Sequence, residues 1–93
     1  MEEWSLYVLR CGDGKLYTGI TTDVERRLSQ HGGQLGAKFM RGKGPFELAY
    51  SVAVGDRSLA SQLEWRVKRL ARRDKLRLIE GEFCWTELFQ EAL

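Results

Sequence analysis

Two apolar segments near the start of the chain carry the alternating pattern of a sheet. Residues 4–11 and 15–20 are rich in aliphatic and aromatic side chains, which suit a pleated, half-buried surface. Between them lies Gly12-Asp13-Gly14, a three-residue loop in which Gly14 can take the left-handed conformation without steric cost. The pattern therefore predicts a β-hairpin.

The loop also sets the register of this hairpin. If Cys11 lies opposite Lys15, then Tyr7 faces Gly19, and Tyr7, Tyr17 and Gly19 share one face because side chains alternate along a strand. Glycine has no side chain, so we expect a hollow beside the two tyrosine hydroxyls, where a ligand can approach closely. Gly19 is thus a candidate substrate contact.

A helical pattern follows the hairpin. Thr22 and Glu25 have the spacing of a capping box, which predicts a helix that starts near Asp23. Val24 and Leu28 recur one turn apart and form the stripe that this helix should bury.

Two polar residues lie beside that stripe. Arg27 and His31, the only histidine of the chain, are four positions apart and lie one above the other on the helix. Arg26 points elsewhere, toward solvent. Only one arginine of the pair is therefore placed for a site. The plainer interpretation of His31 is a partly buried helix residue.

Alternation resumes over residues 46–54 and predicts a third strand with Leu48, Tyr50, Val52 and Val54 on one face. Asp56 is a suitable N-cap for a helix that continues to about Arg72, and a short helix over residues 74–80 follows a break near Arg73. The apolar stripe of the longer helix consists of Leu59, Leu63, Val67 and Leu70.

A single carboxylate lies at the edge of that stripe. Glu64 can reach a partly buried pocket, where a carboxylate must be neutralised, paired or bound to a cation. Lys68, four residues later, offers the simplest partner, in a pair worth only about 0.3–0.5 kcal/mol. Spacing alone slightly favours this ion pair over a metal. Trp65 lies on the opposite side of the helix, where contact with a partner is one option.

Ninety-three residues, 43% of them hydrophobic, predict one domain over residues 1–93 with a core at about 4–80. No apolar run has the length of a membrane helix, and the acidic start is unlike a signal peptide. Two cysteines are too few for a disulfide scaffold and lack metal-ligand spacing, so we expect a cytoplasmic protein. The last apolar residues should dock on the domain or on a partner: Phe83, Trp85, Leu88 and Phe89.

The net charge of +2 conceals a strong separation of charges. Thirteen of the 15 Lys and Arg residues lie between Arg26 and Arg77, with only four acids among them. A basic block of this kind attracts a phosphate backbone, and a solvated helix face is the alternative. Lys38 and Arg41, in a glycine-flanked segment, are candidate substrate contacts, as is Lys68.

These residues together resemble the GIY-YIG nuclease family. Ser5-Leu6-Tyr7 stands for the first signature tripeptide and Tyr17-Thr18-Gly19 for the second. The likeness is greatest to the short stand-alone bacterial members, and extends to the Slx-type endonucleases and the N-terminal domain of excinuclease UvrC. It implies an α/β (α+β) fold, a three-stranded, mainly antiparallel sheet flanked by helices.

The resemblance also implies an activity and its residues. The family's arginine, helical histidine and metal-binding glutamate fall on Arg27, His31 and Glu64, so the expected protein is a DNA endonuclease that uses one Mg²⁺ or Mn²⁺ ion. Tyr17 would be the general base, with Tyr7 and His31 orienting the attacking water. Branched or damaged DNA is the expected substrate class.

Two other functions stay open. Many members of the family carry a late asparagine in the site, and this chain has no asparagine. A nucleic-acid-binding module without turnover, or a nuclease subunit that needs a protein partner, would also fit the sequence.

Overall fold

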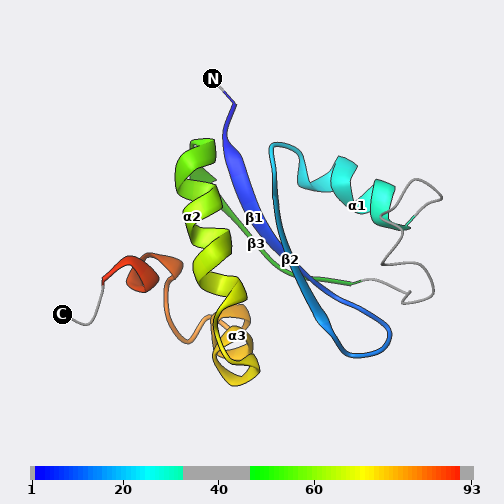
Figure 1. Ribbon diagram of the computed structural model, residues 1–93. Coiled ribbons are helices and arrows are strands. Elements are labelled where there is room, and N and C mark those ends of the chain that lie inside the picture. The colour runs from blue at the N-terminus through cyan, green and yellow to red at the C-terminus, as the bar shows by residue number, and fades with distance from the viewer. Residues whose placement is uncertain (1, 33–46, 91–93) are drawn as a thin grey trace.

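The computed structural model describes residues 2–32 and 47–90, with only the backbone given for 29–32. Its sheet contains β1 (Trp4–Arg10), β2 (Leu16–Thr21) and β3 (Glu47–Gly55) in the order β2-β1-β3 (Figure 1). Both neighbouring pairs are antiparallel. With helices on both sides of the sheet, this is the α+β fold that the sequence predicts.

The β1–β2 hairpin has the predicted register. Tyr7 pairs with Gly19, and the Cys11 amide donates to the Lys15 carbonyl oxygen at 2.9 Å across the mouth of the turn. Gly14 adopts a φ of +89°, a left-handed conformation that side chains disfavour. The glycine therefore lets a short loop reverse the chain.

Strand β3 differs from its predicted pattern at one point. The pairing shifts between Val8, which lies opposite Tyr50, and Leu9, which lies opposite Leu48, so Ala49 is an extra residue in the ladder. This bulge places Leu48 on the opposite face of the sheet from Tyr50. The prediction that both share a face is wrong, and Leu48 is 40% exposed.

The helices are α1 (Val24–Gly32), α2 (Arg57–Lys68) and α3 (Arg72–Ile79), with a short 3₁₀ turn, η2, at Trp85–Phe89. Figure 1 shows α2 beside the sheet with α3 at its end, and α1 displaced to the far side of β2. The two sides of the sheet thus carry different helices.

Helix α2 starts as predicted and ends early. The Asp56 carboxylate accepts the Leu59 amide at 2.8 Å, the bond of an N-cap. The helix ends at Lys68 and not near Arg72, because the Arg69 amide turns back to the Arg66 carbonyl at 3.2 Å. Helix α3 consequently starts at Arg72, two residues before the predicted short helix.

Each face of the sheet has its own apolar cluster. On the α2 side, residues of β1, α2 and α3 form the main core, which consists of Leu6, Val8, Leu63, Val67 and Leu78. On the α1 side, a smaller cluster of Tyr7, Leu9 and Cys11 packs against Tyr17, Val24 and Leu28. Alternation along β1 produces this division.

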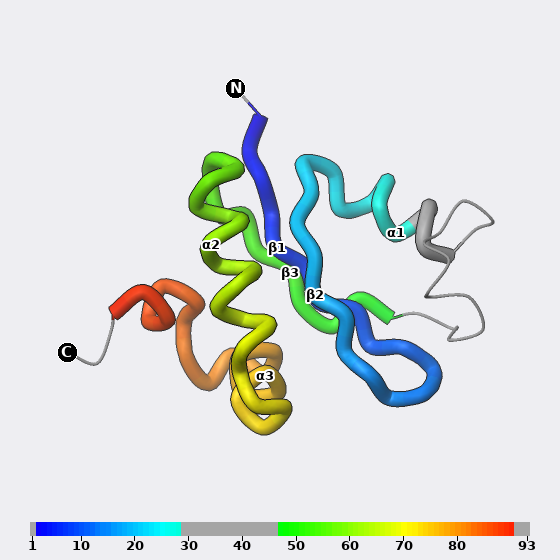
Figure 2. The backbone as a smooth tube through the Cα atoms, in the orientation of Figure 1, coloured from blue at the N-terminus to red at the C-terminus, as the bar shows by residue number. Residues whose placement is uncertain are grey.

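The C-terminal apolar residues dock on the protein itself. Phe83, Trp85, Leu88 and Phe89 all pack against the main core. Arg66 of α2 donates from Nη1 to the Leu88 carbonyl oxygen at 3.2 Å, and its guanidinium lies 4.8 Å from the centre of the Phe89 ring. Figure 2 shows η2 running beside α2.

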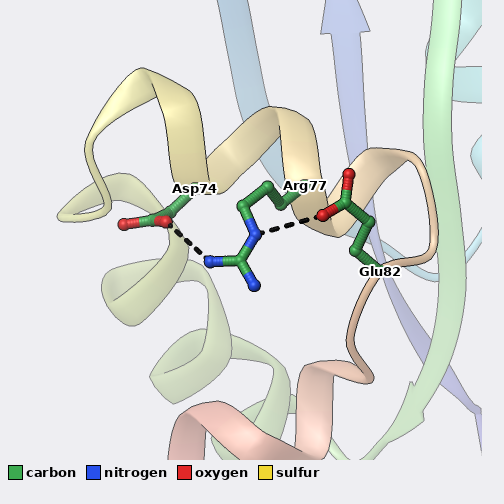
Figure 3. A network of polar contacts seen from close by, with 3 residues as sticks. All are labelled: Asp74, Arg77 and Glu82. Atoms are coloured by element: carbon green, nitrogen blue, oxygen red, sulfur yellow. Dashed lines mark hydrogen bonds and ion pairs between the residues drawn. The ribbon is translucent and has the colours of Figure 1, made fainter.

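A small polar network holds the segment that leaves α3. Arg77 lies 3.3 Å from Asp74 and 3.3 Å from Glu82, so one guanidinium joins the helix to the loop that follows it (Figure 3). All three side chains are more than 40% exposed, and exposed pairs contribute little to stability. Their role is local orientation of the chain. None of the helices that the structure describes has the length and apolar character of a membrane span.

Candidate active site

Tyr7 lies at the centre of the site and is almost completely buried, with 1% of its surface exposed. Its ring lies across Gly19, where an added Cβ would lie 2.5 Å from the Tyr7 hydroxyl oxygen. Only glycine at this position leaves room for the Tyr7 ring. The space over Gly19 that we expected to be open to a ligand is therefore occupied by Tyr7. Contact between Gly19 and a substrate stays a prediction, now restricted to its backbone.

The second tyrosine comes from the neighbouring strand. The ring centres of Tyr7 and Tyr17 lie 6.4 Å apart, with their planes inclined at 51°. Tyr17 is half-buried, while Tyr7 is enclosed. The predicted sharing of one face is confirmed, and the two phenols differ in their access to solvent.

Helix α1 supplies the arginine. Val24 and Leu28 pack on the Tyr7 cluster, as predicted, and this orientation brings Arg27 into a hydrogen bond with Tyr7. Arg27 is half-buried. A half-buried arginine that is hydrogen-bonded to a hydroxyl loses less side-chain entropy when it binds an anion than a fully exposed arginine does.

Electrostatics keep the Tyr7 hydroxyl protonated. Burial is the largest of the effects that raise its pKa to about 12, and the negative charges that Tyr17 and Glu64 would carry act in the same direction. Arg27 opposes this effect through its positive charge and its hydrogen bond. Tyr7 is therefore a neutral donor or acceptor at physiological pH. The Tyr7 hydroxyl of β1 is thus close enough to Tyr17 of β2, Arg27 of α1 and Glu64 of α2 for their charges to influence its pKa.

Glu64 is the group that α2 contributes. Its side chain is 25% exposed, and Oε2 lies 3.2 Å from Nζ of Lys68, which is 54% exposed. The ion pair that spacing favours is thus present. Within residues 2–28 and 47–90, whose side chains the structure describes, no three His, Cys, Asp or Glu side chains gather in one place. A cation at this position would bind the Glu64 carboxylate, and Lys68 would compete for it.

The start of α1 differs from the predicted capping box. The helix begins at Val24, and the cap is the Asp23 carboxylate, which accepts the Arg26 amide at 3.0 Å. Thr21, which is 6% exposed, accepts the Asp23 amide at 3.1 Å on its hydroxyl. The Thr22 hydroxyl is therefore not the cap, because the helix starts one residue later than that assignment requires.

Beside this cap lies a cavity of about 250 Å³ lined by Thr21, Thr22, Asp23, Arg26 and Arg27. Arg26 is exposed, as expected, yet it shares this cavity with Arg27. Sequence reasoning missed Arg26 because a helical wheel separates neighbours by 100° and takes no account of the length of the side chain. The polar run Thr21-Thr22-Asp23 before the helix was the available sign of a polar cavity at this point.

Three predicted residues lie outside this description. The backbone of His31 continues α1, but its side chain is outside the described part of the chain. Lys38 and Arg41 lie wholly outside the described residues. The structure thus brings together Tyr7, Tyr17, Gly19, Arg27, Glu64 and Lys68.

Comparison with known proteins identifies relatives across most of the chain. A sequence model described as the GIY-YIG catalytic domain matches residues 3–77. The UPF0213 protein YhbQ of Escherichia coli O9:H4 is 60% identical over 88 residues, which cover 95% of this chain and 88% of that protein. Its counterpart in Escherichia coli O1:K1 is 56% identical over the same shares.

Two solved structures are also similar. The solution structure of the UPF0213 protein BH0048 from Bacillus halodurans has 39% sequence identity and a TM-score of 0.57, and the match covers 97% of this chain and 96% of that one. The solution structure of EF2693 from E. faecalis has 34% identity and a TM-score of 0.62, with coverage of 86% and 85%.

Proposed function

The chain belongs to the GIY-YIG catalytic domain family, and on this premise we propose that it is a metal-dependent endonuclease that hydrolyses phosphodiester bonds in DNA. Branched or damaged DNA, as arises in repair and recombination, is the proposed substrate class, and the cytoplasm the proposed compartment. One observation carries the proposal. The buried hydroxyl of Tyr7, on β1, is influenced electrostatically by Tyr17 of β2, Arg27 of α1 and Glu64 of α2.

The donor set fits one hard divalent ion. Mg²⁺ commonly binds one or two carboxylates, keeps several waters and takes further oxygens from a phosphate. Glu64 offers one partly exposed carboxylate whose partner is the exposed ammonium of Lys68, which a cation of higher charge could displace. When bound, Mg²⁺ or Mn²⁺ would supply Lewis-acid stabilisation of the phosphate and of the leaving oxygen.

Arg27 serves the phosphate. Its guanidinium is a planar fork of donors that matches two phosphate oxygens, where negative charge gathers in the transition state. Packing of Val24 and Leu28 on the tyrosine cluster holds the helix that carries it. The hydrogen bond to Tyr7 fixes the guanidinium before substrate arrives.

The two tyrosines divide the proton chemistry. Tyr7 has a pKa of about 12 and stays protonated, so it orients the attacking water through its hydroxyl and is a poor base. Tyr17 is the more exposed phenol and is the proposed general base, taking a proton from that water. His31, on the same helix as Arg27, is proposed to assist in orienting the water or in passing its proton to solvent.

Substrate binding is proposed for Lys68, Lys38 and Arg41, together with the backbone of Gly19. With a cation on Glu64, the Lys68 ammonium would be free at the edge of the site to pair with a phosphate. The basic block of the sequence supports a nucleic-acid substrate in general.

Two alternatives remain within the same family. A binding module would keep the basic surface and lack turnover, and a nuclease subunit would cut only with a protein partner. The absence of asparagine from the sequence is the observation that keeps both in view.

The first test incubates the purified chain with labelled single-stranded, duplex, flap and junction DNAs, each with Mg²⁺, with Mn²⁺ and with chelator. We expect metal-dependent cutting that disappears in Tyr17→Phe, a variant that keeps the ring and removes the hydroxyl. Binding without cutting on every DNA would contradict the stand-alone enzyme and favour one of the alternatives.

A further inference from the structure

Trp65 is the most exposed large apolar residue among residues 2–32 and 47–90. Its side chain is 58% exposed on α2, and the other such residue, Leu48, lies on β3 at 40%. The bulge in β3 directs Leu48 toward the face of the sheet opposite α2. The two residues therefore do not form one apolar patch, and among the residues that the structure describes Trp65 is a separate exposed aromatic surface.

A cation covers part of that surface. The Arg69 guanidinium lies 4.6 Å from the centre of the Trp65 ring, one helical turn further along. A guanidinium at this distance from an indole forms a cation–π pair. More than half of the tryptophan remains accessible, so the pair can accept another flat, π-rich group.

The surroundings of this pair are strongly basic. The sequence contains no acid between Glu64 and Asp74, and the exposed bases of that stretch are Lys68, Arg69, Arg72 and Arg73. A protein-binding hot spot is normally an aromatic anchor within a ring of contacts that exclude water. Isolated aromatic surface among cations is instead typical of proteins that bind single-stranded nucleic acid.

The pair also lies next to the site. Successive residues of a helix are 100° apart, so the order around α2 is Glu64, then Lys68, then Trp65 and Arg69. Lys68 pairs with Glu64 and, three positions from Trp65, is also its neighbour on the helix surface. A strand whose phosphate pairs with Lys68 would therefore have its next nucleotide beside this surface.

We propose that Trp65 and Arg69 form a stacking platform for an unpaired base of the nucleic acid, beside the phosphate that occupies the site. This inference rests on the proposed function to the extent that the chain binds nucleic acid, and it does not require cleavage. It assigns the substrate a single-stranded segment next to the scissile phosphate, as in a flap or an overhang.

The test measures binding in chelator, so that no strand is cut, by anisotropy of a labelled DNA. One probe is a blunt duplex, and the second is the same duplex with a single-stranded arm. Trp65→Leu keeps apolar bulk without a ring, Trp65→Phe keeps a ring, and Leu48→Ala is the control for loss of exposed apolar surface elsewhere.

From the strength of base–aromatic stacking we expect Trp65→Leu to weaken binding of the armed duplex about 5- to 30-fold. Binding of the blunt duplex should change less than about 2-fold, because it offers no unpaired base to stack. Trp65→Phe should restore most of the loss, and Leu48→Ala should match the unchanged protein.

Equal binding of the armed duplex by Trp65→Leu and the unchanged protein would overturn the inference, as would equal losses on both probes or no binding of either. Cleavage assays with metal, run separately, test the enzyme. A selective loss on the armed duplex without any cleavage would leave the platform standing and contradict only the endonuclease.

Discussion

The two faces of the sheet use the same central strand for different purposes. On the α2 side, β1 presents Leu6 and Val8, which are buried in an apolar core with α2 and α3. On the α1 side, the intervening residue Tyr7 meets Tyr17 and Arg27, in a cluster that includes hydroxyl and guanidinium groups. One face is mainly apolar, and the other combines apolar packing with polar chemistry.

The difference shows how a small chain separates stability from chemistry. Burial of aliphatic side chains on one face stabilises the fold without polar cost. On the other face, burial changes what a phenol can do, since it raises the pKa of Tyr7 to about 12. We therefore expect substitutions in the apolar core on the α2 face to change folding, and substitutions in the polar cluster around Tyr7 on the α1 face to change reactivity.

The largest effect should follow from Leu63→Ala, in the core on the α2 face. Leu63 is fully buried, so its truncation leaves a cavity and should lower the free energy of unfolding by about 2–5 kcal/mol. Denaturant melts measure this, with the exposed Leu48→Ala as control. If the folded fraction of Leu63→Ala also cleaved DNA more slowly than the unchanged protein, the division between a stabilising face and a reactive face would be contradicted.

Arg27→Ala should have the next largest effect, which should fall on the rate of cleavage and not on stability. Loss of a charged donor to the transition state should slow cleavage about 10²–10³-fold with little change in the melt. Arg26→Ala is the matched control, since Arg26 lines the same cavity and is not hydrogen-bonded to Tyr7 by any described contact. Equal losses of cleavage rate in both variants would show that Arg27 has no specific role and that the two arginines act only by attracting phosphate.

Gly19→Ala should affect both properties. Its Cβ would lie 2.5 Å from the Tyr7 hydroxyl oxygen and 2.6 Å from the ring, so a buried side chain must move. Overpacking of this kind costs about 1–3 kcal/mol. In a Tyr7→Leu background the same change should cost much less, and a double-mutant cycle measures the difference. Additive effects would contradict the close packing of the two residues.

The smallest effect should appear at high pH. Tyr7 has a pKa of about 12 when folded and about 10 when unfolded, so above pH 10 the unfolded chain loses this proton first. Stability is fully present below pH 10 and falls as pH rises, by about 1.4 kcal/mol at pH 11. Tyr7→Phe should lack this part of the decline when the free energy of unfolding is measured against pH. Equal slopes for the two proteins above pH 10 would contradict the raised pKa of Tyr7.

Much of the hairpin could be predicted because its information is local. Gly14 marks the turn, and the turn fixes the register that pairs Tyr7 with Gly19. The end of α2 could not be predicted in this way. The sequence predicts a break near Arg73, whereas α2 ends at Lys68. Residues 69–73 contain no glycine or proline to mark the position of the break, and packing of Leu78 into the core places α3.

The proximity of several candidate residues was predictable, and their environment was not. The sequence singled out Arg27 and Glu64 as candidates, and the charges of both influence the pKa of the Tyr7 hydroxyl. The bulge at Ala49 and the near-complete burial of Tyr7 depend on contacts between distant segments, which periodicity does not encode. The ion pair between Glu64 and Lys68 was one of two alternatives that spacing left open.

The central position of β1 also has a consequence for the order in which the chain folds. Its pairing with β2 closes a loop of a few residues, which takes about 1–10 μs for a hairpin. Its pairing with β3 must wait for a much longer loop that contains all of α1. We therefore expect both tyrosines to be in register early and the remaining strand to join later. Changes in β3 should slow folding without altering how the two tyrosines pair.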